Sequence, residues 1–310
     1  MIANSHASMR LFLYGVITLF SVLLGTLLAQ VLVPALTGVS ILTVSSDPSL
    51  SAPGSLNAAR IFQLIISVSW FLLTPLVYSM VVYRRQALQF LKFEPIRPAR
   101  IYFTGIVLLL VCVPFVSWLQ QINMGFDLGA TAKAAEEQAT NLTKKFLDMP
   151  TPGDFIFNLV MVALIPALGE ELYFRGVLQQ ILKEWLKKPW PAILITAAIF
   201  SAVHGQFLTF LPRFFLGIVL GFVFERSGSI WLSVLLHLIN NGIQVVLVYL
   251  FQRGFIHINL MDNQQELPWW IGLASALATL ALFILFYKQS GWFKPTEKAP
   301  LYGTGMDHDL

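Results

Sequence analysis

The sequence predicts an all-α, polytopic integral membrane protein with about eight transmembrane helices around a polar intramembrane cavity. Hydrophobic residues make up 56% of the 310 residues, and charged residues make up only 12%. The mean hydropathy is +0.72. This composition is too apolar for a soluble globular domain, and the chain is too long for a single membrane anchor. Because the spans use most of the chain, any chemistry has to lie within or between the helices.

Eight apolar stretches have the length of roughly 17 to 25 residues that crosses a bilayer as a helix. They cover residues 11–35, 59–83, 101–120, 153–172, 190–207, 208–226, 229–252 and 268–288. With the amino terminus inside, fourteen of the twenty basic residues fall in inner segments. This bias predicts that both termini face the cytoplasm, and the compact chain is typical of a prokaryotic inner membrane protein.

The spans group into four regions along the chain. These are a three-span N-terminal region (1–152), a four-span core (153–252), a region with the last span (253–291) and a cytoplasmic tail (292–310). The tail combines Pro, Gly, Lys and Asp without periodicity and is predicted to be disordered.

The second outer loop contains a patterned stretch, residues 131–147. Ala135, Ala139, Leu142 and Phe146 recur there at helical spacing among Lys and Glu. This pattern predicts an amphipathic helix that lies on the membrane surface.

Cysteine and charge usage exclude other kinds of site and partner. Cys112 is the single cysteine, so neither an intrachain disulfide nor a cysteine-based metal cluster can form. The isoelectric point of about 9.2 does not indicate a nucleic-acid partner, because the basic residues are scattered over loops. The expected partners are the lipid bilayer and a membrane-anchored substrate.

Two adjacent carboxylates, Glu170 and Glu171, end the apolar stretch 155–168. Ionisable residues at membrane depth are expensive and usually perform a function. On a helix Glu171 and Arg175 share a face, whereas Glu170 points about 100° away from Glu171. We therefore expect Glu171 to pair with Arg175 and Glu170 to be left for chemistry.

Two histidines and an asparagine stand on other predicted spans. His204 ends the run that begins at Phe200, and His237 lies four residues before Asn241, so that both share one helical face. Converging on one polar cavity, which we expect to open to the inner side, these groups and Glu170 would supply a base, a second proton carrier and oxyanion donors.

The same residues also permit a purely structural interpretation. An intramembrane histidine often serves as a hydrogen-bonding group between helices, and Asn240 and Asn241 can join helices in the same way. The pair of Glu171 and Arg175 can simply mark the inner end of a span. The individual motifs leave both interpretations open.

The predicted depths of two candidate residues impose a condition on the fourth span. Glu170 lies ~24 Å along a helix from Asp154, near the inner boundary, whereas His204 lies ~21 Å from Trp190, toward the outer one. The two cannot meet if the spans are straight and upright. We therefore predict a long fourth helix that continues to about Lys183, or else a fifth helix that begins below the bilayer and tilts.

Three motifs occur in order within the apolar core: Glu-Glu-x-x-x-Arg, Phe-x-x-x-His and His-x-x-x-Asn. This combination resembles the CPBP family, the CAAX proteases and bacteriocin-processing enzymes also called the Abi family, which includes the type II CAAX prenyl endopeptidases. The resemblance covers about residues 153–252. In it, Glu171 and Arg175 match supporting positions of the first motif.

The resemblance implies an intramembrane endopeptidase with four catalytic residues. Glu170 matches the essential glutamate, and His204 matches its partner in activating water. His237 and Asn241 match the pair that stabilises the oxyanion. The substrate implied is a membrane-associated peptide or protein, prenylated or bacteriocin-like.

The residues leave two interpretations of the metal question. Glu170, His204 and His237 could ligate Zn²⁺ with water in the fourth place. However, no His-Glu-x-x-His helix is present, and asparagine is an uncommon zinc ligand. We favour water activation without a metal or other cofactor.

Two other functions are compatible with the same residues. A proton- or ion-coupled transporter also places glutamate and histidine inside the membrane, although it usually shows broken helices or repeated halves. A non-catalytic bacteriocin immunity protein could keep the fold while the motif residues serve packing. Substitution of Glu170 or His204 separates these alternatives from an enzyme.

Overall fold

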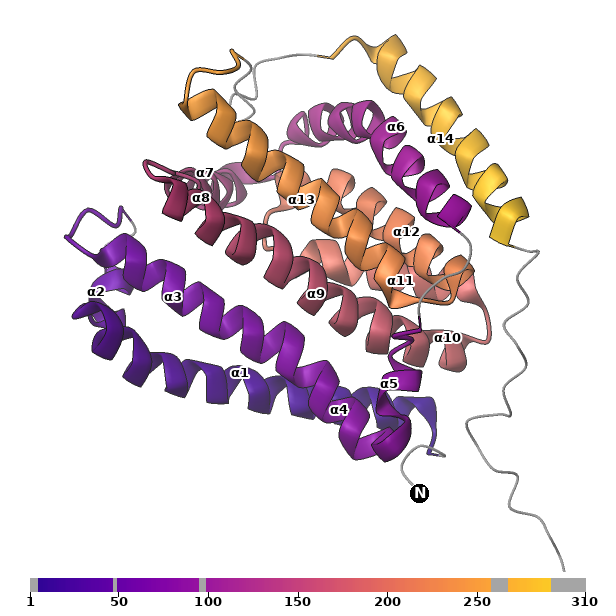
Figure 1. Cartoon of the computed structure of the whole chain (residues 1–310), viewed down its shortest axis with the longest axis horizontal. Helices are drawn as coiled ribbons and strands as arrows, with labels where there is room; N and C mark the ends of the chain where they lie inside the picture. Colours follow the sequence, from indigo (N-terminus) through magenta and orange to yellow (C-terminus); the bar gives the residue numbers. More distant parts are fainter. Residues whose placement is uncertain (1–4, 47–48, 95–98, 258–266, 291–310) are drawn as a thin grey trace, which may run out of the picture.

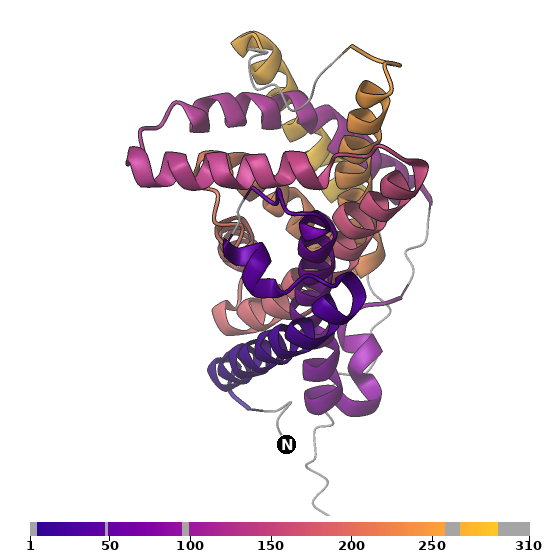
Figure 2. The same ribbon diagram turned by 90° about the vertical axis from the view of Figure 1, so that its left-hand side faces the viewer.

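The computed structural model describes residues 5–46, 49–94, 99–257 and 267–290. Within these ranges every regular element is a helix and no strand occurs, which confirms the predicted all-α class. The long helices run roughly side by side, whereas α7 crosses them (Figures 1 and 2). The tail that we predict to be disordered, residues 292–310, lies outside the described residues.

The first three spans belong to the N-terminal region. In chain order their elements are α1 (Ala7–Thr37), α2 (Ile41–Ser46), α3 (Ser55–Ser67), a π-helical segment (Val68–Leu73), α4 (Thr74–Tyr83), a 3₁₀ turn (Arg84–Gln86), α5 (Ala87–Phe90) and α6 (Ala99–Met124). The amphipathic helix predicted after the third span is α7 (Gly129–Phe146), which has no buried residue. Its helical state is confirmed.

The fourth span is one helical run of 35 residues, Pro152–Leu186. It consists of α8 (Pro152–Asn158), a π-helical segment (Leu159–Leu164), α9 (Ile165–Glu171), a second π-helical segment (Leu172–Gln179) and α10 (Gln180–Leu186). A capping box starts it, because Thr151 and Asp154 each accept the other's backbone N–H at 3.1 Å. The prediction that this helix continues to about Lys183 is confirmed.

The remaining elements follow the long helix. They are α11 (Pro189–Ala202), a 3₁₀ turn (Phe207–Thr209), α12 (Phe210–Ser227), α13 (Ile230–Gln252) and α14 (Trp269–Ser290). α13 is capped at its start by Ser229, whose hydroxyl accepts the N–H of Trp231 at 3.3 Å.

The described residues contain seven helices that are long and apolar enough to span a membrane, which shows an integral membrane protein and is close to the predicted count of about eight. The eighth stretch, predicted over 190–207, forms the shorter helix α11. Its 14 residues rise only ~21 Å, less than the ~30 Å of a hydrocarbon core. It ends early because Gly205 adopts φ +68°, a left-handed conformation that glycine takes without strain.

Contacts between helix termini show that the first and last described helices meet the same end of the bundle. Arg10, near the start of α1, forms an ion pair with Glu184 at the end of the long helix. Arg226, at the end of α12, donates to Ser290 at the end of α14. Both ends of the described chain therefore lie at one end of the bundle, and α7 lies at the other, before the long helix begins (Figure 1). Which of these ends faces the cytoplasm stays a prediction.

The largest apolar core packs around the second half of the long helix. Phe174, Val177 and Ile181 are fully buried there against Tyr14 of α1 and Tyr78 of α4. The Tyr14 hydroxyl also donates to the carbonyl of Tyr173 at 3.0 Å. This packing fixes the part of the helix that directly follows Glu170 and Glu171.

Candidate active site

The two glutamates stand at the end of α9, where the helix changes to its second π-helical segment. The Glu171 side chain is fully buried, whereas that of Glu170 is 12% exposed and lines a cavity. Neighbouring positions on a helix point about 100° apart, which explains the difference. As predicted from spacing, one carboxylate is sealed in the protein and the other is accessible.

Glu171 forms a buried ion pair with Arg175. The Arg175 Nη1 donates to Glu171 Oε1 at 2.7 Å, and both side chains are 0% exposed. The Arg175 Nη2 donates to the carbonyl of Gly217 on α12 at 3.0 Å, and its guanidinium lies 4.9 Å from the centre of the Phe200 ring. The predicted pair is confirmed, and it also links the long helix to α11 and α12.

His237 lies between the two glutamates. Its Nδ1 is 2.9 Å from Glu171 Oε1, and its Nε2 is 3.8 Å from Glu170 Oε2. Because a carboxylate accepts hydrogen bonds, Nδ1 carries the hydrogen and Nε2 faces the cavity side. Glu171 therefore orients His237 as well as Arg175, a role that the sequence pattern did not reveal.

Asn241 occupies a gap that a proline creates in the long helix. Pro166 has no N–H to donate to the carbonyl four residues earlier, that of Val162. The Asn241 Nδ2 donates to this carbonyl at 3.2 Å, and the Asn241 Oδ1 accepts from Asn240 Nδ2 at 3.0 Å. The amide is thus held in one orientation, beside His237 on the same face of α13.

His204 stands just beyond the end of α11, on non-helical backbone. Its Nδ1 lies 2.8 Å from the carbonyl of Phe200. Since a carbonyl only accepts, Nδ1 carries the hydrogen, and Nε2 is left as the acceptor of a neutral imidazole. Irregular backbone at membrane depth is tolerated where it lines a cavity. His204 does so, and the early end of α11 leaves its ring open to that space.

One cavity of about 730 Å³ joins the four predicted catalytic residues. α3, α6, α7, α9, α11, α12 and α13 all contribute to its wall. The titratable side chains that line it are Glu170, His204, Arg213 and His237. Glu170 and His204, whose predicted depths conflicted, share the cavity because the long helix carries Glu170 to its middle.

The cavity extends toward the α7 end of the bundle. Ala139, Leu142, Thr143 and Phe146 of α7 line it, and no residue of α10 does. The polar cavity predicted from the motifs was expected to open toward the end that carries the termini, and the structure corrects this expectation. The reason is that α11 stops short, which leaves the space above His204 to be covered by α7.

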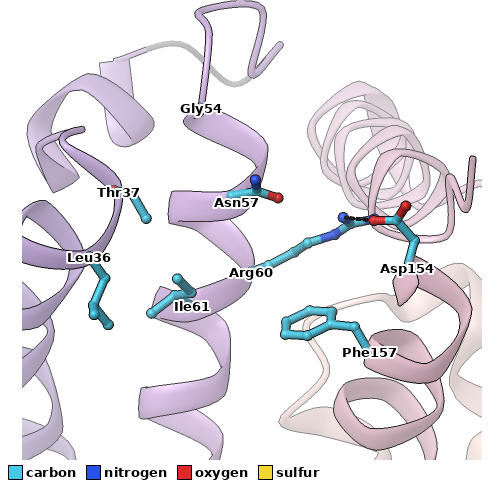
Figure 3. A pocket seen from close by; sticks show the side chains of 8 residues that line it. All are labelled: Leu36, Thr37, Gly54, Asn57, Arg60, Ile61, Asp154 and Phe157. Atoms are coloured by element: carbon cyan, nitrogen blue, oxygen red, sulfur yellow. Dashed lines mark hydrogen bonds and ion pairs between the residues drawn. The ribbon is translucent and has the colours of Figure 1, made fainter. Parts of the chain in front are cut away.

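Arg60 ties α7 to the neighbouring spans. It lies 3.3 Å from Asp154 of α8 and donates to the carbonyls of Phe146 and Asp148 at 2.7 and 2.8 Å. Figure 3 shows Arg60 reaching from α3 toward Asp154 beside a pocket of about 450 Å³. These bonds hold the carboxyl end of α7 over the cavity.

Arg213 is a cavity residue that the sequence analysis did not single out. It stands in the first turn of α12 and contacts Gln206 and Thr209. A signal was present, because Arg213 is the only charged residue in the apolar run from Phe207 to Phe224, where ionisable residues usually have a function.

The proposed metal ligands do not form a metal-binding group in this structure. Within the described residues, no three His, Cys, Asp or Glu side chains converge in a way that could hold a metal ion. This includes the set of Glu170, His204 and His237.

Fold and cavity together define a helical integral membrane protein with a glutamate, histidine and asparagine site. Residues 152–243 match the family described as Type II CAAX prenyl endopeptidase Rce1-like, and all seven residues named in the three motifs lie in this segment. The resemblance predicted from the motifs is thereby confirmed for this part of the chain, and at the level of the family it supports a CAAX-type intramembrane protease.

One curated relative is the "Uncharacterized 24.3 kDa protein" of Escherichia coli, which is 34% identical over 101 residues. The match covers 31% of this chain and 46% of the relative, so the chain spans about half the length of the relative that it matches. No solved structure matches the chain significantly.

Proposed function

We propose that this protein is an intramembrane endopeptidase that hydrolyses a peptide bond of a membrane-associated substrate with water activated by Glu170 and His204. The observation that carries this proposal is the one cavity lined by Glu170 of α9, His204 of the turn after α11 and His237 of α13. The Rce1-like match over the same helices supports it. The geometry also supports a division of roles among the residues.

In the proposed reaction, Glu170 takes a proton from a water molecule, and the resulting hydroxide attacks the carbonyl carbon of the scissile amide. His204 assists this proton transfer, because its Nε2 is available as an acceptor. The carbonyl oxygen becomes an oxyanion. A proton then passes to the amide nitrogen, the carbon–nitrogen bond breaks, and a carboxylic acid and an amine leave the site.

His237 and Asn241 are proposed to stabilise the oxyanion. The Asn241 amide has two N–H groups, one of which is donated to the Val162 carbonyl, and the other remains for the oxyanion. When His237 is protonated at Nε2, its N–H can also donate to the oxyanion, and its positive charge stabilises the negative charge there. Glu171 and Arg175 act as positioning residues, because they hold His237 and the helix that presents Glu170.

The proposed substrate is anchored in or at the membrane and is prenylated or bacteriocin-like. The cavity lies among apolar helices, so a substrate that already resides in the bilayer reaches it most directly. We place the protein in a prokaryotic inner membrane with both termini in the cytoplasm, as the distribution of basic residues favours.

Comparison of membrane peptidomes tests the proposal. Cells that produce the wild-type protein should contain cleavage products that are absent with Glu170→Gln or His204→Ala. Matched controls are Glu137→Gln on α7 and His257→Ala beyond α13, both exposed and away from the cavity. These controls should leave the products unchanged.

Two results would overturn the proposed function. One is an identical peptidome with wild type and with Glu170→Gln. The other is loss of folded protein in both site variants, which would favour a packing role for the motif residues. Ion flux that depends on Glu170, in the absence of cleavage, would support a transporter instead.

A further inference from the structure

Arg213 places a permanent positive charge in the wall of the catalytic cavity. It is the only Lys or Arg among the residues that line this cavity. Its Nη2 donates to Gln206 Oε1 at 2.5 Å, and its Nη1 donates to the hydroxyl of Thr209. Both partners are neutral, so the charge is hydrogen-bonded but not neutralised by them.

The buried arginines among the described residues differ from the half-buried Arg213 in having a direct counter-ion. Arg10, Arg60 and Arg175 each contact a carboxylate. Among the described residues, no carboxylate lies within 4.0 Å of Arg213. A charge in an apolar setting is costly when it is unpaired. The arrangement is that of a site whose counter-ion arrives with a ligand.

The surroundings hold Gln206, and with it the guanidinium, in place. The Gln206 Nε2 donates to Glu136 Oε1 of α7 at 3.2 Å, which leaves the Gln206 oxygen turned toward Arg213. Asn123 clamps the following turn, since it donates to the carbonyl of Phe207 at 3.0 Å and accepts the N–H of Leu211 at 2.6 Å. The α7 helix, the end of α6 and the turn after α11 thus orient Arg213.

Arg213 retains donors for a ligand. A guanidinium has five N–H groups in a planar fork that matches a carboxylate. Thr209 and Gln206 use one each, and three remain. Glu136 of α7 and Glu170 both interact with Arg213 electrostatically, and neither forms an ion pair with it. Arg213 and Glu170 line the same cavity, so a ligand in that cavity can contact both residues.

We propose that Arg213, oriented by Gln206, is an anion-recognising specificity residue that binds a carboxylate of the substrate near the scissile bond. The carboxylate is either the C-terminal group of the peptide or an Asp or Glu side chain. This inference rests on the proposed function for the identity of the ligand as a peptide. Recognition of the carboxylate by Arg213 can be measured as peptide binding, without cleavage.

Peptide binding to non-cleaving full-length protein tests the proposal separately from catalysis. The Glu170→Gln variant in lipid nanodiscs is titrated with four fluorescent apolar peptides. Their sequences are matched: a free C-terminal acid, its C-terminal amide, the amide with an internal Asp, and the amide with an internal Asn. Fluorescence anisotropy reports the dissociation constants in the Glu170→Gln background and in Glu170→Gln combined with Arg213→Gln.

We expect at least one acidic peptide to bind about 10- to 100-fold more tightly than its neutral counterpart, the usual range for a charge-assisted hydrogen-bonded pair. Arg213→Gln should remove this preference and leave the neutral peptides unchanged. A preference for the free acid identifies the terminal carboxylate, and a preference for Asp over Asn identifies a side chain. Arg213→Lys should retain part of the preference, because it keeps the charge and loses the fork.

Controls separate recognition from folding and from an effect on Glu170. Lys144→Gln removes an exposed charge of α7 that does not line the cavity and should change nothing. Thermal unfolding of each variant reports folding, and Gln206→Ala offers a second way to disturb Arg213. Equal binding of all four peptides, or no binding by any, overturns the inference. If the acidic preference is found but the wild-type protein cleaves none of these peptides and yields no cleavage products in cells, the result counts against the proposed function alone.

Discussion

Two pairs of charged residues near the same cavity, Glu171 with Arg175 and Glu170 with Arg213, differ in their access to it. Glu171 and Arg175 are sealed, with 0% exposure and a 2.7 Å bond between them. Glu170 and Arg213 face the open cavity, and no ion pair joins them within the described residues. The first pair neutralises its two charges against each other inside the protein. The second pair keeps its charges accessible from the cavity, so burial and pairing, rather than residue type, distinguish the two pairs.

The largest effect on the cleavage rate should come from substitution of Glu170, which faces the cavity. Glu170→Gln is expected to lower the cleavage rate about 10²- to 10⁴-fold, the usual contribution of a general base. Folding should change little, because this side chain makes no hydrogen bond that the fold needs. Turnover of the substrate and thermal unfolding in detergent measure the two effects. Full activity in the folded variant would contradict the assignment of the base.

Substitutions in the buried pair of Glu171 and Arg175 should lower the stability of the protein and not only its cleavage rate. Arg175→Met leaves the Glu171 carboxylate buried without its cation and should lower the free energy of unfolding by about 3–5 kcal/mol. Adding Glu171→Gln to this variant should restore part of the loss, although His237 loses its charged partner. Denaturation in mixed micelles measures both variants. Equal stability of wild type and Arg175→Met would show that the pair is dispensable.

Substitution of Asn241 tests whether one residue contributes both to stability and to the cleavage rate. Asn241→Ala should cost about 1–3 kcal/mol of stability, because the Val162 carbonyl loses its donor beside Pro166. It should also lower the cleavage rate about 10²- to 10³-fold if the amide donates to the oxyanion. Unfolding and turnover together distinguish the two roles. The matched control is Gln244→Ala, which lies one turn further along the same cavity wall.

The smallest effect is expected from chelation. Water activation without a metal predicts that purified protein contains no stoichiometric zinc and that a chelator leaves its cleavage rate unchanged. Metal analysis beside an activity assay with and without the chelator measures this. Stoichiometric zinc together with chelator-sensitive activity would make Glu170 a ligand and would reverse our assignment of the open carboxylate.

Helical spacing predicted much of the site correctly. The ion pair of Glu171 with Arg175 follows from a four-residue separation, and the long fourth helix follows from the depths of Glu170 and His204. The span predicted over 190–207 was too long, since the hydropathy of this stretch continues beyond Gly205, where the backbone turns left-handed. Apolar composition alone does not register such a turn.

The contacts of His237, Asn241 and Arg213 could not be read from spacing. Each depends on a partner far along the chain: Glu171 for His237, the Val162 carbonyl for Asn241, and Glu136, through Gln206, for Arg213. The expected direction of the cavity also failed, because it depends on where α7 comes to rest. The spacing of residues within one helix says nothing about contacts between residues that are far apart in the chain.

The sequence by itself determined the helical membrane class, the order of the motif residues and the pairing of Glu171 with Arg175. These follow from hydropathy and from the 3.6-residue period of a helix, which are local properties of the chain. The tertiary structure alone decided that the cavity extends toward α7, that His237 bridges the two glutamates, and that Arg213 stands without a direct counter-ion among the described residues. These depend on how distant helices pack, which only the folded chain establishes.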